Sequence, residues 1–358
     1  MNHREDEMGE PIAAPVRVGL LGAGRIAQSA HLPAIAHAPS VQLIGLFDPS
    51  DYLREAVSRR YEVTAYPTAQ ALLDDPSIES VIVAVPDRFH AAAALEALGK
   101  GKHVLVEKPL ASTVAEAEMV VDASRRSGKI VQVGSMKRHD PGVRFAARVV
   151  TERIGRILSA TFWYRVMSAL RPATEATFFP PMVVDPAVRA VEAAHRPDRA
   201  AYLLATHGAH VFDTLRHLCG EATSLMVRHA VVGDDHAWHG LASLAEGGLA
   251  HVEIAATVHA EWSEGAWIHG ERGSVTVRTP FPVSLQASVV EAFDEASGVA
   301  ERPVFGDTNP YKLQVEAFAR AIRQGTRASP DAEDGVAAVR LIEAASRSAT
   351  SGGTWVTP

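Results

Sequence analysis

The stretch VRVGLLGAGRIA, residues 16–27, decides the fold of the first part of this chain. An apolar strand over 16–21 runs directly into a glycine-rich turn. Gly22 permits a backbone bend where a β-carbon would clash, and Gly24 lets the main chain approach a pyrophosphate closely. This Gly-x-Gly-x-x-Ala pattern predicts a dinucleotide-binding turn, because it follows a strand and opens a helix. A glycine turn in an α/β protein without a nucleotide is the alternative.

The residues after the turn extend the same pattern. A helix over 25–37 would point its first N–H groups at the anion, which makes Arg25 and Ile26 further candidate contacts. A second apolar run, 41–47, ends at Asp48. This is the place where a carboxylate meets the ribose hydroxyls in dinucleotide-binding folds.

Asp48 bears on the choice between the two nicotinamide cofactors. A carboxylate accepts both ribose hydroxyls of NAD and repels the 2′-phosphate of NADP. Arg54 follows one helical turn later and would allow NADP. The pattern favours NAD, with NADP possible. Asp48 could also cap the helix that follows it, since Asp-Pro commonly opens a helix.

Strand and helix patterns alternate through residues 16–134, which predicts a doubly wound parallel sheet with its ligand outside the strand carboxyl ends. The apolar runs are short and continuous, as buried parallel strands are. Strands are expected at 16–21, 41–47, 80–85, 103–106 and 130–133, and helices at 25–37, 51–60, 68–74, 88–99 and 113–127.

Two of these strands end in segments that carry candidate site residues. One is VPDRFH, 85–90, with Pro86 and His90, and the other is VLVEKP, 104–109, with Glu107 and Lys108. A lysine at the end of a buried strand costs desolvation energy unless it has a partner or a task. Lys108 is therefore a candidate active-site residue, and all four are placed on the cofactor side; a surface lysine is the alternative.

Composition limits the class of protein. The chain has 358 residues, a net charge of −7 and a single cysteine. These values argue against a nucleic-acid groove and a disulfide framework. No run approaches the roughly 20 apolar residues that span a membrane. Residues 1–15 are read as a mobile tail without a signal core. The expectation is a cytoplasmic protein with no metal site, since the scattered histidines show no metal-ligand spacing.

The second domain is expected over 137–358, after a boundary near 135–140. Strand patterns recur across 162–290, and Gly-containing turns at 246–248 and 271–273 predict hairpins and a mostly antiparallel sheet. Helices are expected at 310–324 and 334–349, and these could pack back on the first domain. The long stretch 168–204, containing FFPP, Asp185, Glu192, His195, Arg196 and Asp198, is either a cover over the substrate or a subunit-contact arm.

The segment 206–219 has a helical pattern, with Val211, Leu215 and Leu218 facing the core. Another face carries the polar side chains of Thr206, His210, Asp213 and His217, and the neighbouring His207 could contact a substrate. An imidazole titrates near neutrality, so His210 suits the release of a proton in alcohol oxidation. The alternative is a histidine that only packs beside an aspartate.

At this point the chain resembles the glucose–fructose oxidoreductase and inositol dehydrogenase superfamily, Gfo/Idh/MocA. The resemblance rests on GAGRIA at 22–27, VPDRFH at 85–90, EKP at 107–109, GAHVFDTLRHLCG at 208–220 and the C-terminal pattern at 334–352. It implies a Rossmann domain followed by an α+β domain with a large open sheet, through which members form oligomers. It also implies oxidation or reduction of a sugar or cyclitol with NAD(P).

The resemblance also implies roles for individual residues. Lys108 would contact both the nicotinamide and the reacting hydroxyl, and His210 would be the catalytic histidine, with Thr206, His207 and Asp213 near the substrate. Members often carry an aspartate where this chain has Thr206, and often an asparagine where it has Asp87. These departures leave proton transfer to His210, to Lys108 or to a carboxylate from elsewhere.

The sequence therefore predicts an NAD(P)-dependent dehydrogenase acting on a polyol or sugar, which forms a homodimer or homotetramer through the second sheet. Two alternatives remain open. One is a non-catalytic sensor that binds a dinucleotide and a sugar, and the other is a glycosidase that oxidises and re-reduces its substrate with NAD.

Overall fold

The computed structural model describes residues 14–167, 182–188, 190, 198–281 and 283–358. The expected tail lies almost wholly outside the described residues, as do FFPP, Glu192, His195 and Arg196. No helix within the described ranges is long and apolar enough to cross a membrane.

The first half folds around a six-stranded parallel sheet with the order β3-β2-β1-β4-β5-β6. Its strands are β1 Val16–Leu21, β2 Val41–Phe47, β3 Thr64–Ala65, β4 Ser80–Val83, β5 His103–Val106 and β6 Val131–Val133. The five expected strands are confirmed in place. β3 was not expected, since two exposed residues carry no readable pattern.

The helices of this half lie close to their expected positions. They are α2 Asp51–Tyr61, α3 Ala69–Asp74, α4 His90–Gly99 and α5 Val114–Ser127, with a short 3₁₀ turn, η2 Asp87–Phe89, before α4. The helix expected over 25–37 is shorter and divided. A π-helical turn, η1 Ala27–His31, passes into α1 Leu32–Ala36.

The second half contains an eight-stranded sheet with the order β14-β13-β12-β11-β7-β10-β9-β8. Its strands are β7 Ile157–Met167, β8 Ala222–Val232, β9 Asp235–Leu244, β10 Leu249–Val258, β11 Ser263–Gly270, β12 Gly273–Thr279, β13 Val289–Asp294 and β14 Val299–Glu301. The hairpins expected at 246–248 and 271–273 are confirmed. The pair β7–β10 is parallel, so the sheet is mostly antiparallel. The strand pattern over 283–290 is corrected, because only its last two residues enter β13.

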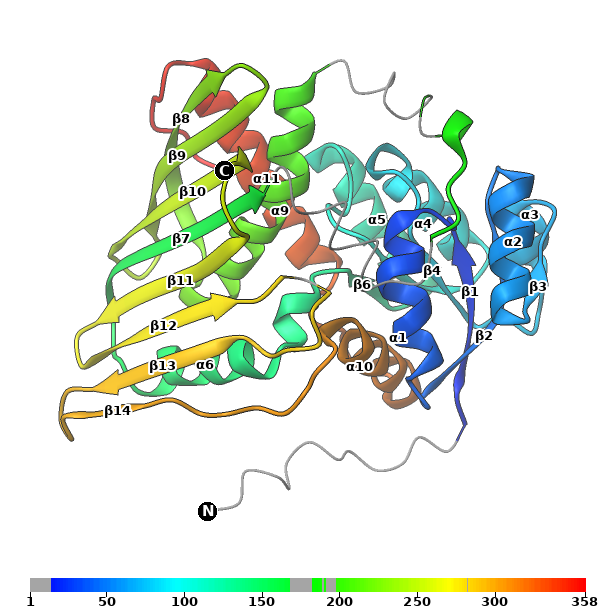
Figure 1. Ribbon diagram of the computed structural model, residues 1–358, viewed down its shortest axis with the longest axis horizontal. Coiled ribbons are helices and arrows are strands. Elements are labelled where there is room, and N and C mark those ends of the chain that lie inside the picture. The colour runs from blue at the N-terminus through cyan, green and yellow to red at the C-terminus, as the bar shows by residue number, and fades with distance from the viewer. Residues whose placement is uncertain (1–13, 168–181, 189, 191–197, 282) are drawn as a thin grey trace.

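Helices cover one face of this sheet, as Figure 1 shows. They are α6 Pro141–Glu152, α9 Arg199–Cys219 and α11 Ala332–Thr350, and a short 3₁₀ turn, η3 Met136–His139, links β6 to α6. The expected inward positions Val211, Leu215 and Leu218 are all buried. α9 begins earlier than the pattern indicated, after the Asp198 side chain caps it.

The last two helices complete the core of the first half. In α10, Pro310–Gln324, Val315 and Phe318 pack with residues of β1 and β2. On the other side, Val336 of α11 packs with residues of β5 and β6. Both faces of the parallel sheet therefore depend on the C-terminal part of the chain. In Figure 1, α9 and α11 lie between the two sheets, beside the carboxyl ends of the parallel strands.

Candidate active site

The glycine turn after β1 has the geometry that a dinucleotide requires. Gly22 has φ of 95°, and a β-carbon there would lie 2.5 Å from the carbonyl oxygen of Ala84. A β-carbon on Gly24 would meet nothing within 4 Å. Gly22 therefore fits the turn against the neighbouring strand, whereas Gly24 faces open space where a phosphate could approach. The residues present fit a dinucleotide, with the first N–H groups of η1 beside them.

Asp48 lies at the end of β2 and is buried. One carboxylate oxygen accepts the Ala23 N–H at 2.8 Å, and the other accepts the Ser50 N–H at 2.9 Å. Burial raises the pKa of Asp48, while these two N–H groups oppose the rise. The Ser50 side chain, not Asp48, caps α2. Asp48 thus fixes the glycine turn to the end of β2, and its contact with a ribose stays a prediction.

A segment from the second half lies against the glycine turn. The Gln28 side chain donates to the carbonyl oxygens of Ala23 and Val183, at 2.8 and 2.9 Å, and accepts the Val183 N–H at 2.9 Å. Ser50 donates to Asp185 at 2.6 Å. The described part of the stretch 168–204 therefore reaches over the cofactor side of the parallel sheet. Sequence reasoning did not identify Gln28 as a site residue, because its partner lies 155 positions away.

Two of the expected cofactor contacts hold the strand ends together. His90 is buried, and its two ring nitrogens lie 2.6 and 2.9 Å from the carbonyl oxygens of Pro109 and Val85. Glu107 is buried against the His31 imidazole at 2.8 Å, and its other oxygen accepts the Lys108 N–H at 3.2 Å. Protein groups thus engage the polar atoms of His90 and Glu107, and the expected contacts of these residues with a cofactor stay predictions.

Lys108 reaches from the end of β5 to the helix that lines the second half. Its ammonium lies 3.4 Å from the main-chain carbonyl oxygen of Thr206 in α9. The Thr206 hydroxyl donates to the Asp87 carboxylate at 3.1 Å. The two strand ends β4 and β5 and the middle of α9 therefore meet at Thr206. His210 follows one helical turn later.

Around His210 the inner face of the second sheet supplies an aromatic group. The Tyr164 ring of β7 stacks on His210, with centroids 5.0 Å apart and an interplanar angle of 11°. His207 lies 5.4 Å from the same ring. Trp262 meets the Tyr164 ring edge at 4.9 Å, and its buried indole N–H has no acceptor among the described residues.

A buried ion pair lies beneath this aromatic group. The ammonium of Lys137, in η3, pairs with Glu264 of β11 and lies 4.7 Å from the Tyr164 ring centre. Tyr164 and Glu264 are register partners on adjacent strands, which explains why both side chains meet Lys137. Burial lowers the pKa of Lys137 and raises that of Glu264, and their mutual attraction opposes both shifts.

Asp213 takes a different place from the one expected. Its carboxylate accepts both Nε and Nη2 of Arg138, at 3.1 and 2.7 Å, and is buried. Arg138 also binds Asp334 of α11, which in turn pairs with Arg216. Through Arg138 the carboxylate therefore joins η3, α9 and α11, and its expected contact with a substrate stays a prediction.

The structure thus brings Lys108, Thr206, His207 and His210 together and keeps Gly22, Gly24, Arg25, Ile26 and Pro86 on the strand-end side. It adds Asp87, Lys137, Tyr164 and Glu264 to the site. Within the described ranges, no group of three or more His, Cys, Asp or Glu side chains could hold a metal ion.

This arrangement is that of a dinucleotide-dependent oxidoreductase, in which a Rossmann turn and a lysine lie at the strand ends and the lysine contacts the helix that carries a histidine. Comparisons with known proteins agree. Residues 16–135 match the model of an oxidoreductase family, NAD-binding Rossmann fold, and residues 186–357 match that of its C-terminal alpha/beta domain. The chain belongs to the Gfo/Idh/MocA oxidoreductase family and binds NAD(P) through its first domain.

Relatives extend along almost the whole chain. An inositol 2-dehydrogenase of Acidothermus cellulolyticus is 28% identical, over 94% of this chain and 93% of its own. A D-xylose 1-dehydrogenase (NADP(+)) of Haloferax volcanii is 27% identical, over 93% and 97%. Levoglucosan dehydrogenase, solved with NADH and L-sorbose, has the same fold, with a TM-score of 0.80 and 22% identity over 96% of this chain and 98% of its own.

Proposed function

We propose that the protein is an NAD(P)-dependent dehydrogenase that acts on a secondary hydroxyl of a cyclitol or sugar. The observation that carries this proposal is the meeting of Lys108 with α9 at Thr206, one turn before His210. This contact supports the proposal because it brings the lysine, at the carboxyl end of β5, to the helix that carries His210.

The chemistry divides between the cofactor and the chain. When bound, the nicotinamide accepts a hydride from the carbon of the reacting C–OH group. Lys108 would donate a hydrogen bond to the oxygen of that group, and His210 would take up its proton. Tyr164 supports this role by holding the His210 imidazole in a stacked orientation.

The substrate class follows from the groups around His210. The buried indole N–H of Trp262 lacks an acceptor among the described residues, and it lies beside the Tyr164 ring. A hydroxyl-rich ring would supply such an acceptor and present its C–H face to the aromatic side chains. The names of the relatives, which include inositol and xylose dehydrogenases, support the same class.

The test is a screen of cyclitols, aldoses and polyols, followed at the nicotinamide absorbance with NAD and NADP in parallel. We expect turnover with at least one polyhydroxylated ring and a preference for NAD, because the Asp48 carboxylate repels a 2′-phosphate. Tight NADH binding without turnover would instead support a sensor. Hydrolysis of an aryl glycoside without net NADH would support a redox-cycle glycosidase.

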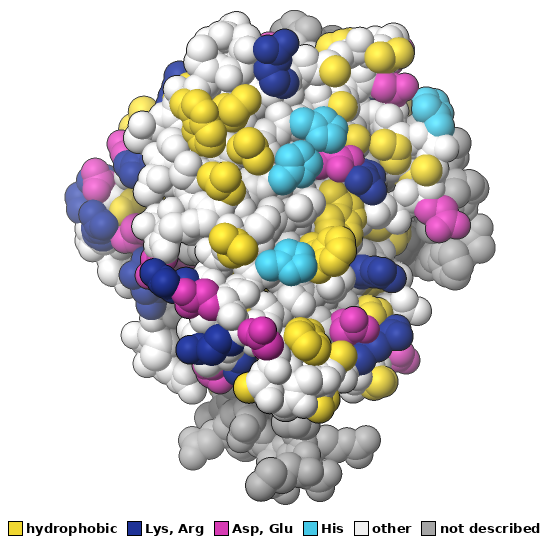
Figure 2. Space-filling view, turned by 90° about the vertical axis from the view of Figure 1, so that its left-hand side faces the viewer, with side chains coloured by type: hydrophobic (Ala, Val, Ile, Leu, Met, Phe, Trp, Pro, Cys, Tyr) yellow, Lys and Arg dark blue, Asp and Glu magenta, His cyan; other side chains and the backbone are white. Residues whose placement is uncertain are grey.

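We further propose that the uncovered face of the second sheet binds a second copy of the chain. Figure 2 shows apolar and histidine side chains gathered on this face. Leu249 and Trp267 are exposed there, and His239 lies 3.4 Å from His251. An exposed apolar sheet face of this kind usually marks an interface.

Light scattering on the purified chain tests the interface. A dimer or tetramer is expected for the wild type, and Trp267→Glu should lower the mass because it buries a charge at the contact. A monomeric wild-type chain would exclude this interface and leave the proposed reaction untouched.

A further inference from the structure

We propose that Asp87 is a positioning residue that supplies the active-site carboxylate of this chain, acting through Thr206 on Lys108. The inference rests on the proposed dehydrogenase function and names a group that none of the expected site residues includes. It is carried by one chain of contacts, from the Asp87 carboxylate to the Thr206 hydroxyl, and from the Thr206 carbonyl oxygen to the Lys108 ammonium.

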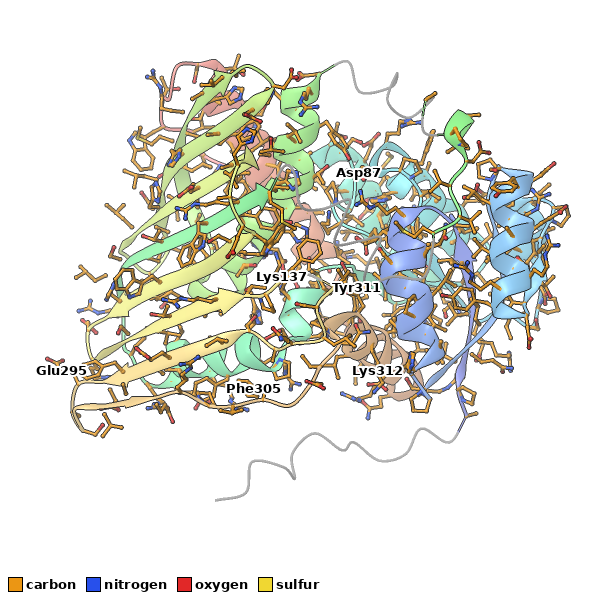
Figure 3. All side chains as sticks on the ribbon, in the orientation of Figure 1. Asp87, Lys137, Glu295, Phe305, Tyr311 and Lys312 are labelled. Carbon is orange, nitrogen blue, oxygen red and sulfur yellow. The ribbon has the colours of Figure 1, made fainter. Side chains whose placement is uncertain are left out.

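The fold explains why these groups meet. β4 and β5 are adjacent parallel strands, with Val83 paired to Val106. Asp87 begins η2 just after β4, and Lys108 follows β5 directly. Carboxyl ends of adjacent parallel strands share one edge of the sheet, so both side chains leave it on the same side. In Figure 3, Asp87 and Lys137 lie in the middle of the molecule, between the two sheets.

Thr206 is the residue of the second half that contacts both the Asp87 carboxylate and the Lys108 ammonium. Its hydroxyl donates a hydrogen bond to the Asp87 carboxylate, so a neutral group of the second half contacts this charge. Its carbonyl oxygen receives the Lys108 ammonium at 3.4 Å. A single residue of α9 therefore sets the position of an anion and of a cation from the first half. Helical geometry then fixes His210 one turn further on.

The charges around Lys108 make the carboxylate useful. The Glu107 carboxylate is paired with His31, and the Asp213 carboxylate is paired with Arg138. The ammonium of Lys137 is already paired with Glu264. Within the described ranges, Asp87 is the carboxylate near Thr206 and Lys108 that forms no ion pair. It therefore offers the negative charge against which Lys108 can be held as a hydrogen-bond donor to substrate.

The experiment removes the carboxylate from residue 87 and then restores a carboxylate at residue 206, its hydrogen-bond partner. Asp87→Asn keeps an acceptor for the Thr206 hydroxyl and removes the charge. We expect kcat to fall about 10- to 100-fold, with the KM for NAD changed by no more than about threefold, because misplacing a catalytic lysine affects the chemical step most. The double variant Asp87→Asn/Thr206→Asp restores the carboxylate on the α9 side, where the new amide can donate to it. It should recover kcat to within about threefold of the wild type.

Two further variants serve as controls. Asp122→Asn removes the same charge from the exposed face of α5 and should leave kcat unchanged. Thr206→Val keeps Asp87 but removes the hydroxyl through which it acts, and it should lower kcat about as much as Asp87→Asn does. Melting temperature and NADH fluorescence titration show that each variant is folded and binds cofactor.

The outcomes separate this inference from the proposed function. If the wild type oxidises no polyol, the proposed function fails, and the role of Asp87 fails with it. If the wild type is active and Asp87→Asn matches it, only the inference is overturned. A double variant that stays as impaired as Asp87→Asn would also overturn it, since a negative charge returned to the Asp87–Thr206 pair would then not support Lys108.

Discussion

The candidate site has two sides, and different kinds of contact stabilise them. The parallel strand ends make one, the cofactor wall, and α9 with the second sheet makes the other, the substrate wall. On the wall made by the parallel strand ends, polar side chains bind the backbone. Asp48 accepts two main-chain N–H groups, and His90 lies between two main-chain carbonyl oxygens. On the wall made by α9 and the second sheet, side chains bind each other, as in the pairs Lys137–Glu264 and Arg138–Asp213.

This difference has a physical consequence for substitutions. A side chain that binds the backbone has a main-chain partner, which is present whatever residue occupies that position, so its hydrogen bond survives most substitutions of the partner. A buried ion pair depends on two distant residues, and removing one partner leaves an uncompensated charge. On the cofactor wall, substitutions of the glycines and of Lys108 should therefore have the largest effects on folding, cofactor binding and activity. On the substrate wall, the largest effects should come from removing one member of a buried ion pair.

The largest expected effect is on the lysine that joins the two walls. Lys108→Met should lower kcat by about 1,000-fold or more, because the group that polarises the reacting oxygen is lost. NADH binding, measured by fluorescence titration, should persist within about fivefold. Lys108→Arg is the matched control that keeps the charge and moves it. Turnover of Lys108→Met close to that of the wild type would remove Lys108 from the site.

The two glycines of the turn should respond differently, which sharpens the account of the cofactor wall. Gly22→Ala should destabilise the fold by about 3 kcal/mol, because the position has positive φ and meets the Ala84 carbonyl oxygen. Gly24→Ala has open space and should leave the fold intact while weakening NADH binding about tenfold. Urea unfolding and NADH titration of both variants test this. Equal stability of the two would contradict it.

The substrate wall can be tested by replacing its buried pair as a unit. Lys137→Met/Glu264→Leu should keep the melting temperature within a few degrees, since apolar replacements of a buried pair are often neutral. We expect kcat to fall about tenfold, because Tyr164 loses the cation beneath its ring and His210 loses a fixed neighbour. Glu264→Leu alone should lose about 3 kcal/mol of stability. Wild-type kcat in the double variant would show that the pair has no role in the site.

The smallest effect expected is a loss of stability in mild acid. Burial lowers the pKa of His139 to about 3 and that of His217 to about 4, and both lie beside Arg138. Both are neutral in the folded and unfolded chain above pH 6.5. Below it the unfolded chain takes up protons that the folded chain excludes, so stability falls as the pH drops toward about 4. Each histidine should cost about 1 kcal/mol between pH 6.5 and 5.5.

Urea titrations at several pH values measure this slope. His217→Gln should flatten it, because one proton uptake is removed from the unfolded chain. Gln324→Ala, at an exposed residue that does not titrate at the end of α10, serves as the control and should leave the slope unchanged. A stability that does not vary between pH 7 and pH 5 would contradict the assignment.

The sequence predicted the cofactor wall better than the substrate wall, and the bonding explains this. Gly22, Asp48 and Lys108 lie in short motifs whose partners are local or on the next strand, so spacing alone places them. β3 and the divided helix after the turn were missed, since two exposed residues and a π-turn leave no periodic signal.

On the substrate wall, the motif at His210 was identified but its surroundings were not. Tyr164 and Glu264 are 100 positions apart, and only the β7–β11 register brings them together. Arg138 and Asp213 are 75 positions apart. Their pairing gives Asp213 a role in linking η3 to α9 that the sequence pattern did not indicate. The sequence showed Asp87 as a departure from the family pattern, but only the structure shows its contact with Thr206.

The packing of α10 and α11 has a consequence for how the chain is made. Val315 and Phe318 cover one side of the parallel sheet and Val336 covers the other, yet they are synthesised about 180 to 200 residues after β6. At roughly 5 to 20 residues per second, the apolar faces of the first half stay uncovered for about 10 to 40 seconds. A ribosome carrying this nascent chain therefore presents an incomplete Rossmann sheet until the last helices emerge, and that interval is when chaperones are most needed.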